Sequence, residues 1–126
     1  MGSQVTGLVV EDEWLLRLEL AEELASAGWA VREAGTGEEA LKLLQQMQTG
    51  GERIDFLVTD IRLGGPVEGW DVAEACRTIW PELPVIYVSA NPIVEKRRVD
   101  GSAFLSKPVE VAHLLSTCRR LIGDRA

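Results

Sequence analysis

The amino-acid sequence predicts an α/β domain in which a doubly wound, parallel β-sheet is covered by helices on both faces. Five short aliphatic runs alternate with amphipathic stretches along the whole chain. The runs are almost continuously apolar, as in strands that are buried on both faces. Parallel strands also need crossover connections, which are usually helices. These two features together favour a sheet with helices packed above and below it.

Each element has its own local signal. Near-continuous aliphatic or β-branched residues indicate strands, and apolar residues at helical spacing indicate helices. Thr36 and Glu39 have the spacing of a capping box at a helix start, and Gly28 suits a helix end. The expected strands are residues 8–10, 29–32, 54–59, 85–88 and 103–105, and the expected helices are residues 13–27, 38–48, 70–80 and 110–122.

The first expected helix carries two apolar stripes, although covering a sheet requires only one. One stripe can face the sheet and consists of Leu16, Leu20, Leu24 and Ala27; the other lies on nearly the opposite side and consists of Trp14, Leu18, Ala21 and Ala25. Two interpretations remain open for the second stripe. Trp14 and Leu18 either fold against neighbouring loops or form a docking surface for a helix of another protein.

Composition limits the classes of function. The 126 residues, 46% of them hydrophobic, suit one domain with one core, which we expect at 5–123 between flexible ends at 1–4 and 124–126. The formal charge of −7 argues against nucleic acid or an anionic membrane as a partner. No apolar run is long enough to span a bilayer, and two cysteines without metal-ligand spacing suit reduced core thiols. We therefore expect a cytoplasmic protein.

Polar residues follow the strands at the positions where a parallel sheet gathers its ligand chemistry. Glu11 and Asp12 come after the first strand, Asp60 after the third, Ser89 after the fourth and Lys107 after the fifth. The carboxyl ends of parallel strands share one edge, so these side chains should converge there. Each residue alone has an ordinary explanation as a turn or surface residue. Their combination in chain order at successive strand ends indicates a site.

Three carboxylates at one edge repel one another unless a cation neutralises them. Oxygen ligands without cysteine or nearby histidine favour a hard ion, and a small site that retains several waters suits Mg²⁺. With the charge balanced, Asp60 can act as a nucleophile toward a phosphoryl group. Lys107 and Ser89 would then stabilise the phosphoryl oxygens.

The same residues resemble the motif set of receiver domains in the two-component response-regulator family. The resemblance covers residues 8 to about 122 and includes an acidic pair, a phosphoacceptor, a hydroxyl and an aromatic switch residue, and a lysine before a proline: Glu11, Asp12, Asp60, Ser89, Phe104 and Lys107. It implies a flavodoxin-like sheet of order 2-1-3-4-5 with about five helices. It also implies a stand-alone phosphoprotein that takes its phosphate from a sensor histidine kinase or a phosphotransfer protein.

The resemblance further implies particular roles. Asp12, Asp60 and the backbone carbonyl of Arg62 would bind Mg²⁺ directly, and Glu11 would act through water. Phosphorylation would draw Ser89 toward the phosphoryl group and let an aromatic side chain, that of Phe104, turn inward. Such a domain is expected to be a phosphoacceptor signalling domain that catalyses its own phosphorylation and dephosphorylation, and not an enzyme.

Two segments depart from the family pattern. The loop at 62–69 is about one residue longer, and the stretch from Ser89 to Lys107 is several residues shorter, with Pro92 at the expected helix start. Little helical length remains, so we expect the helix between the fourth and fifth strands, at 92–99, to be short or irregular. We expect the charges at 96–98 to lie on an atypical output face. The sequence stops soon after the last helix, so we expect signalling through protein partners.

Three alternative functions fit the same elements less well. A receiver-like module could bind partners without being phosphorylated, but it would not need three confined acids. A small Mg²⁺-dependent phosphatase would have a second acid where Arg62 stands. A flavin-binding domain would place phosphate near Glu11 and Asp12, which would repel it.

Overall fold

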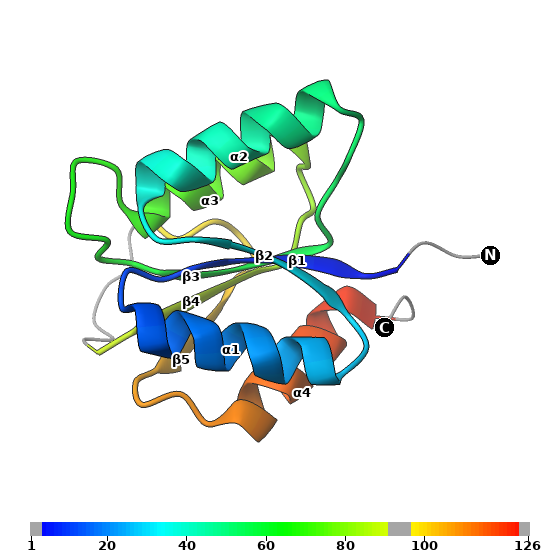
Figure 1. The fold of residues 1–126 in the computed structure, drawn as a ribbon, viewed down its shortest axis with the longest axis vertical. Helices are drawn as coiled ribbons and strands as arrows, with labels where there is room; N and C mark the ends of the chain where they lie inside the picture. Colours follow the sequence, from blue (N-terminus) through cyan, green and yellow to red (C-terminus); the bar gives the residue numbers. More distant parts are fainter. Residues whose placement is uncertain (1–3, 91–96, 124–126) are drawn as a thin grey trace.

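The computed structural model describes residues 4–90 and 97–123 and confirms the predicted fold class. A five-stranded sheet lies between two pairs of helices, with α2 and α3 on one face and α1 and α4 on the other (Figure 1). In chain order the elements are β1 (Thr6–Val10), α1 (Trp14–Ser26), β2 (Ala30–Ala34), α2 (Gly37–Thr49), β3 (Phe56–Asp60), α3 (Gly69–Ile79), β4 (Val85–Ser89), β5 (Ala103–Ser106) and α4 (Val111–Ile122). None of the helices in the described ranges is both long and apolar enough to cross a bilayer.

The sheet is parallel throughout and has the predicted order β2-β1-β3-β4-β5. All residues of β3 and β4 are buried, which explains the apolar residues with which both strands begin. Gly7 in β1 is opposite Phe56 in β3, and a Cβ at Gly7 would lie 2.2 Å from the Phe56 ring. The missing side chain therefore makes room for an aromatic ring in the middle of the sheet.

Alternation along the strands divides the core into two layers. Leu8 and Leu57 point to the side of α2 and α3, whereas Val9 and Val58 point to the side of α1 and α4. All four side chains are at most 1% exposed. This two-sided burial holds the central strands rigidly, and their carboxyl ends provide a fixed platform for a site.

Side-chain caps begin two of the helices, α2 and α3, and the sequence analysis missed the one at α3. The Thr36 hydroxyl accepts a hydrogen bond from the Glu39 amide at 3.0 Å, as predicted, but the Glu39 carboxylate accepts from the amide of Gly35 at 2.8 Å instead of closing the box on Thr36. At the start of α3, Glu68 and Asp71 form a full capping box. The missed box has a glutamate where a serine or threonine is usual.

The second stripe of α1 is partly exposed and partly buried. Trp14 and Leu18 are 66% and 40% exposed, so they do not fold against neighbouring loops of the described chain. The prediction was wrong for Ala21, which is buried beside Leu20 and Leu24 because the face in contact with the sheet is wider than one row. Leu15, which belonged to neither predicted stripe, is 52% exposed.

The connection between β4 and β5 contains the segment for which we expected an irregular helix at 92–99. Residues 91–96 lie outside the described residues, and residues 97–102 form turns. Arg97 contacts the carboxylates of Asp71 at 3.0 Å and Glu74 at 2.9 Å, so its charge is paired with α3. The amide of Val99 donates to the hydroxyl of Tyr87 in β4 at 3.0 Å. The described part of this connection is thus bound to α3 and to the sheet. The described ranges contain four helices, none of them in this connection.

Candidate functional site

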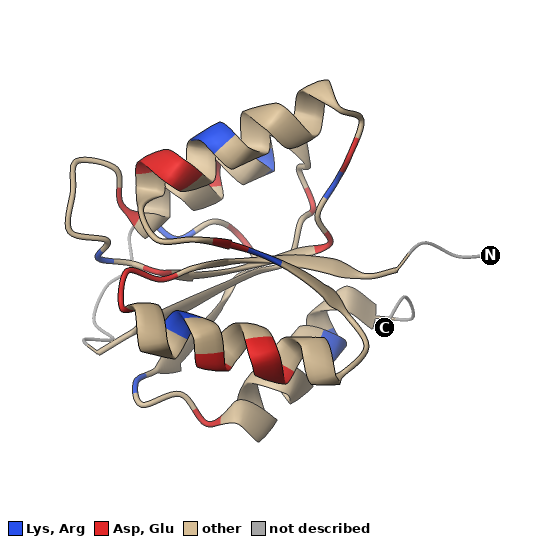
Figure 2. Ribbon diagram, viewed as in Figure 1, with Lys and Arg blue, Asp and Glu red and all other residues tan. Residues whose placement is uncertain are grey.

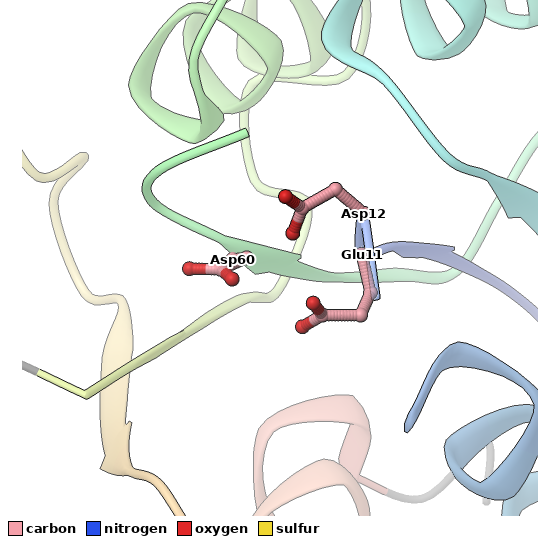
Figure 3. Close-up of side chains that lie close together, drawn as sticks. All are labelled: Glu11, Asp12 and Asp60. Atoms are coloured by element: carbon pink, nitrogen blue, oxygen red, sulfur yellow. The ribbon is translucent and has the colours of Figure 1, made fainter. Parts of the chain in front are cut away.

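Three acidic side chains meet at the carboxyl end of the sheet. Glu11 and Asp12 directly follow β1, and Asp60 is the last residue of the neighbouring β3. Figure 2 shows the acidic segment after β1, and in Figure 3 the three carboxylates reach into the same region beyond the strands. One oxygen from each lies within 4.8 Å of the others. The structure therefore brings together the three acids that the sequence placed at strand ends.

Lys107 places a positive charge against the three acids. It follows β5, and its backbone amide donates to the carbonyl of Ser89 at 2.9 Å, which extends the pairing of β4 and β5 by one step. Its Nζ lies 2.8 Å from Oδ2 of Asp60 and 3.1 Å from Oε1 of Glu11. One ammonium thus contacts two of the three acids, which leaves the cluster with excess negative charge.

The Glu11 carboxylate is the most deeply placed of the three acids, with no exposed surface. Oε2 accepts a hydrogen bond from the amide of Glu13 at 3.0 Å. Oε1 lies near the Lys107 ammonium but has no hydrogen-bond partner among the described residues. Burial raises the pKa of Glu11 to about 7, and the negative charge of Asp60 also raises it.

Lys107 stays charged in this environment. Burial lowers its pKa, but the interactions with the Asp60 and Glu11 carboxylates together outweigh burial and raise its pKa above the usual value. A fixed positive charge therefore stands beside the Asp60 carboxylate at neutral pH.

Asp60 is held by contacts of its carboxylate and by the close packing of α3 against its backbone. Oδ1 accepts a hydrogen bond from the amide of Arg62 at 3.2 Å, and Oδ2 contacts Lys107. The first residue of α3, Gly69, packs against the strand end: a Cβ there would lie 2.0 Å from the carbonyl oxygen of Asp60. The Gly69 amide donates to Ile61 at 2.8 Å. Sequence reasoning missed Gly69, because a glycine in a loop does not show what it approaches.

The sequence profile of the response regulator receiver domain matches residues 8–119. This chain belongs to that family. It is 30% identical to the probable transcriptional regulatory protein TcrX of Mycobacterium tuberculosis over 96% of this chain and 51% of TcrX. It is 29% identical to the sensor kinase CckA of Brucella abortus over 97% of this chain but 13% of that kinase. The chain therefore spans about half or less of these two relatives.

Solved structures agree with the family. A response regulator receiver protein from Sinorhizobium medicae superimposes with a TM-score of 0.88 at 34% identity, and the match covers 98% of both chains. The receiver domain of the hybrid histidine kinase CckA gives a TM-score of 0.78 at 28% identity over 94% of this chain and 99% of that one.

The two predicted switch residues of this receiver domain lie on β4 and β5. Ser89 ends β4, is 5% exposed and pairs in register with Ser106. Phe104 in β5 is partly buried, and its ring centroid lies 6.3 Å from that of Tyr87, which in turn lies 5.0 Å from Trp70 of α3. Phe104 is thus the outer member of an aromatic row that crosses from β5 to α3.

The receiver domain also has a hollow of about 520 Å³ between α1 and the residues that follow β5. Leu15 and Leu16 line it from the helix, and Lys107 and Pro108 line it from the other side. The exposed Trp14 precedes these leucines on the helix. An apolar surface therefore begins beside the lysine of the acidic site.

Proposed function

We propose that this receiver domain accepts a phosphoryl group on Asp60 from the phosphohistidine of a sensor kinase or a phosphotransfer protein. The observation that carries the proposal is the contact of Asp60 with Lys107 at 2.8 Å inside a cluster of three carboxylates. A purely structural domain has no use for such a cluster, because confined acids repel one another. Sensor kinases among the relatives are consistent with this phosphoryl donor.

The residues present fit a Mg²⁺ ion. All donors are hard oxygens, and the buried Oε1 of Glu11 is paired with the Lys107 ammonium but accepts no hydrogen bond from the described residues, so it can accept one from a water of the ion. Asp12, Asp60 and the carbonyl of Arg62 would hold the ion directly, and Glu11 would act through water. When bound, the ion supplies positive charge to the phosphoryl oxygens.

The chain's own residues account for the transfer. A carboxylate oxygen of Asp60 attacks phosphorus as the bond between phosphorus and the donor imidazole breaks. The electron pair of that bond returns to the imidazole nitrogen, and the product is an acyl phosphate. Lys107 is positioned to stabilise a phosphoryl oxygen, and the Ser89 hydroxyl donates to another.

Signalling then follows from a shift between two conformations. Movement of Ser89 toward the phosphoryl group frees space next to Phe104, whose ring turns inward along the aromatic row with Tyr87. The surface around β5 and α4 changes with it, and a protein partner recognises the changed surface.

Intact mass measurement tests phosphorylation against the alternative of a binding module that is never phosphorylated. Wild type, Asp60→Asn and the matched control Asp100→Asn are incubated with acetyl phosphate and Mg²⁺. We expect wild type and Asp100→Asn to gain the mass of one phosphoryl group, and Asp60→Asn to gain none. An unmodified wild type would favour the binding module.

We also propose that Trp14 and Leu18 dock the phosphodonor protein. They are exposed and apolar, and they lie on the helix that lines the hollow leading to Lys107. Trp14→Ala should slow phosphotransfer from the cognate kinase by about tenfold, as for loss of an aromatic anchor, and leave phosphorylation by acetyl phosphate unchanged. Equal rates of phosphotransfer from the kinase to wild type and to Trp14→Ala would show that Trp14 does not dock the phosphodonor protein.

A further inference from the structure

Arg17 in α1 links the acidic segment after β1 to β2. Its Nη1 donates a hydrogen bond to the backbone carbonyl of Glu11 at 2.9 Å, and its Nε lies 3.4 Å from Oε1 of Glu33. The Arg17 side chain is 24% exposed. The partners of Arg17 are a backbone carbonyl and Glu33, so any geometric effect of Arg17 on the carboxylates of the site passes through the backbone.

The backbone at Glu11 is held on both sides. Its amide donates to the carbonyl of Ala34 at 3.1 Å, and its carbonyl accepts from Arg17. That carbonyl belongs to the peptide group that joins Glu11 to Asp12. A change in the ψ angle of Glu11 would swing this carbonyl and, with it, the Asp12 side chain relative to the Glu11 side chain, because the planar peptide group moves as one unit.

The space for the guanidinium is built into the fold. A Cβ at Gly35 would lie 2.8 Å from Nη1 of Arg17, so the absence of a side chain there lets the guanidinium reach the carbonyl. The Gly35 amide is itself fixed by the carboxylate of Glu39 at 2.8 Å. The position of the Arg17 guanidinium therefore depends on the segment after β1, on the loop that contains Gly35 and on the start of α2, which fixes that loop through Glu39.

We propose that Arg17 is a positioning residue that sets the affinity of the acidic site for Mg²⁺ by holding the peptide between Glu11 and Asp12. The inference rests on the proposed metal site and adds a residue outside its ligands. Positioning and simple electrostatics predict opposite results. Removing a positive charge near a cation site should tighten cation binding, whereas releasing the peptide should weaken it.

Calorimetric titration with Mg²⁺ separates these effects. The test variant is Arg17→Met, which keeps the apolar stem but has no donor, and the matched control is Arg32→Ala, which removes an arginine paired with Glu52 elsewhere in the fold. Loss of a residue that orients a metal ligand typically weakens affinity by about tenfold or more. We expect that loss for Arg17→Met and none for Arg32→Ala.

Arg17→Lys is the rescue variant. One ammonium can reach the Glu11 carbonyl but cannot also contact Glu33 in the geometry of a guanidinium, so we expect part of the affinity to return. Thermal unfolding identifies a temperature at which all variants are folded. Equal or tighter Mg²⁺ binding by folded Arg17→Met would overturn the inference. Absence of Mg²⁺ binding by wild type would instead overturn the proposed metal site.

Discussion

Replacing Glu11 with glutamine should change how the stability of the protein depends on pH. In the folded protein, burial raises the pKa of Glu11 to about 7 from an ordinary value of 4.5. Between these two pH values the folded state keeps a proton that the unfolded chain releases. The free energy of unfolding therefore falls as pH rises through this window, when no metal is bound. Glutamine has no proton to lose, so Glu11→Gln should lack this component.

The size of the effect follows from the two pKa values. Each pKa unit corresponds to about 1.4 kcal/mol, so the component should approach about 3 kcal/mol between pH 4.5 and pH 7. It should be fully present below pH 4.5 and lost above pH 7. At pH 8 without Mg²⁺, Glu11→Gln should accordingly be more stable than wild type by up to about the same amount.

Urea denaturation in the presence of a chelator, repeated at pH 5, 6, 7 and 8, measures this component. The difference between wild type and Glu11→Gln isolates the contribution of Glu11 from those of other titrating groups. Glu23→Gln, a change of the same kind at an exposed position of α1, is the matched control and should follow wild type. Parallel pH profiles of the unfolding free energy for wild type and Glu11→Gln would show that burial does not raise the pKa of Glu11 in the folded protein.

The remaining predictions concern packing around the site. Gly69→Ala would push a methyl group into the backbone carbonyl of Asp60 and should cost about 3 kcal/mol of unfolding free energy, whereas Gly50→Ala, at a helix end with a φ of −84°, should be neutral or slightly stabilising in the same urea titration. A small loss of stability in Gly69→Ala would show that position 69 does not lie close to the Asp60 carbonyl. Tyr87→Phe removes the acceptor for the Val99 amide and should cost about 1 kcal/mol and speed tryptic cleavage after Arg98. An unchanged cleavage rate would show that this hydrogen bond does not fasten the segment.

The chain order of elements was enough to predict which residues converge. Asp60 and Lys107 are far apart in sequence, but each follows a strand of a parallel sheet, and the ends of such strands share one edge. Their contact at 2.8 Å is therefore a consequence of topology. The doubly covered parallel sheet could be predicted from the alternating apolar periods, whereas the strand order was implied only by the resemblance to receiver domains.

The finer arrangement of the acids could not be predicted from the pattern. Glu11 and Asp12 are neighbours with similar chemistry, but Glu11 is fully buried and Asp12 is exposed. The backbone on the two sides of Glu11 is held from other elements, because the Glu11 amide donates to the Ala34 carbonyl and the Glu11 carbonyl accepts from Arg17. Tertiary contacts of this kind leave no periodic signal in the sequence.

The apolar face of α1 shows the same limit. Its spacing predicted a second stripe that included Ala21, but Ala21 is buried together with Leu20 and Leu24, so the buried sector of the helix is wider than one row. Leu15 is exposed instead, beside the hollow that reaches Lys107. The width of a helix contact depends on the neighbouring elements, here β2, β1 and α4, as much as on the helix itself.

Locating the phosphoryl group on the chain tests the central claim most directly. Wild type is treated with acetyl phosphate in the presence of Mg²⁺ or a chelator, reduced with borohydride to convert an aspartyl phosphate to homoserine, and sequenced by tandem mass spectrometry. The account predicts homoserine at position 60, dependent on Mg²⁺ and lost in Lys107→Ala or greatly reduced there. Modification at another residue, or equal modification of Asp60 without a divalent ion, would contradict it.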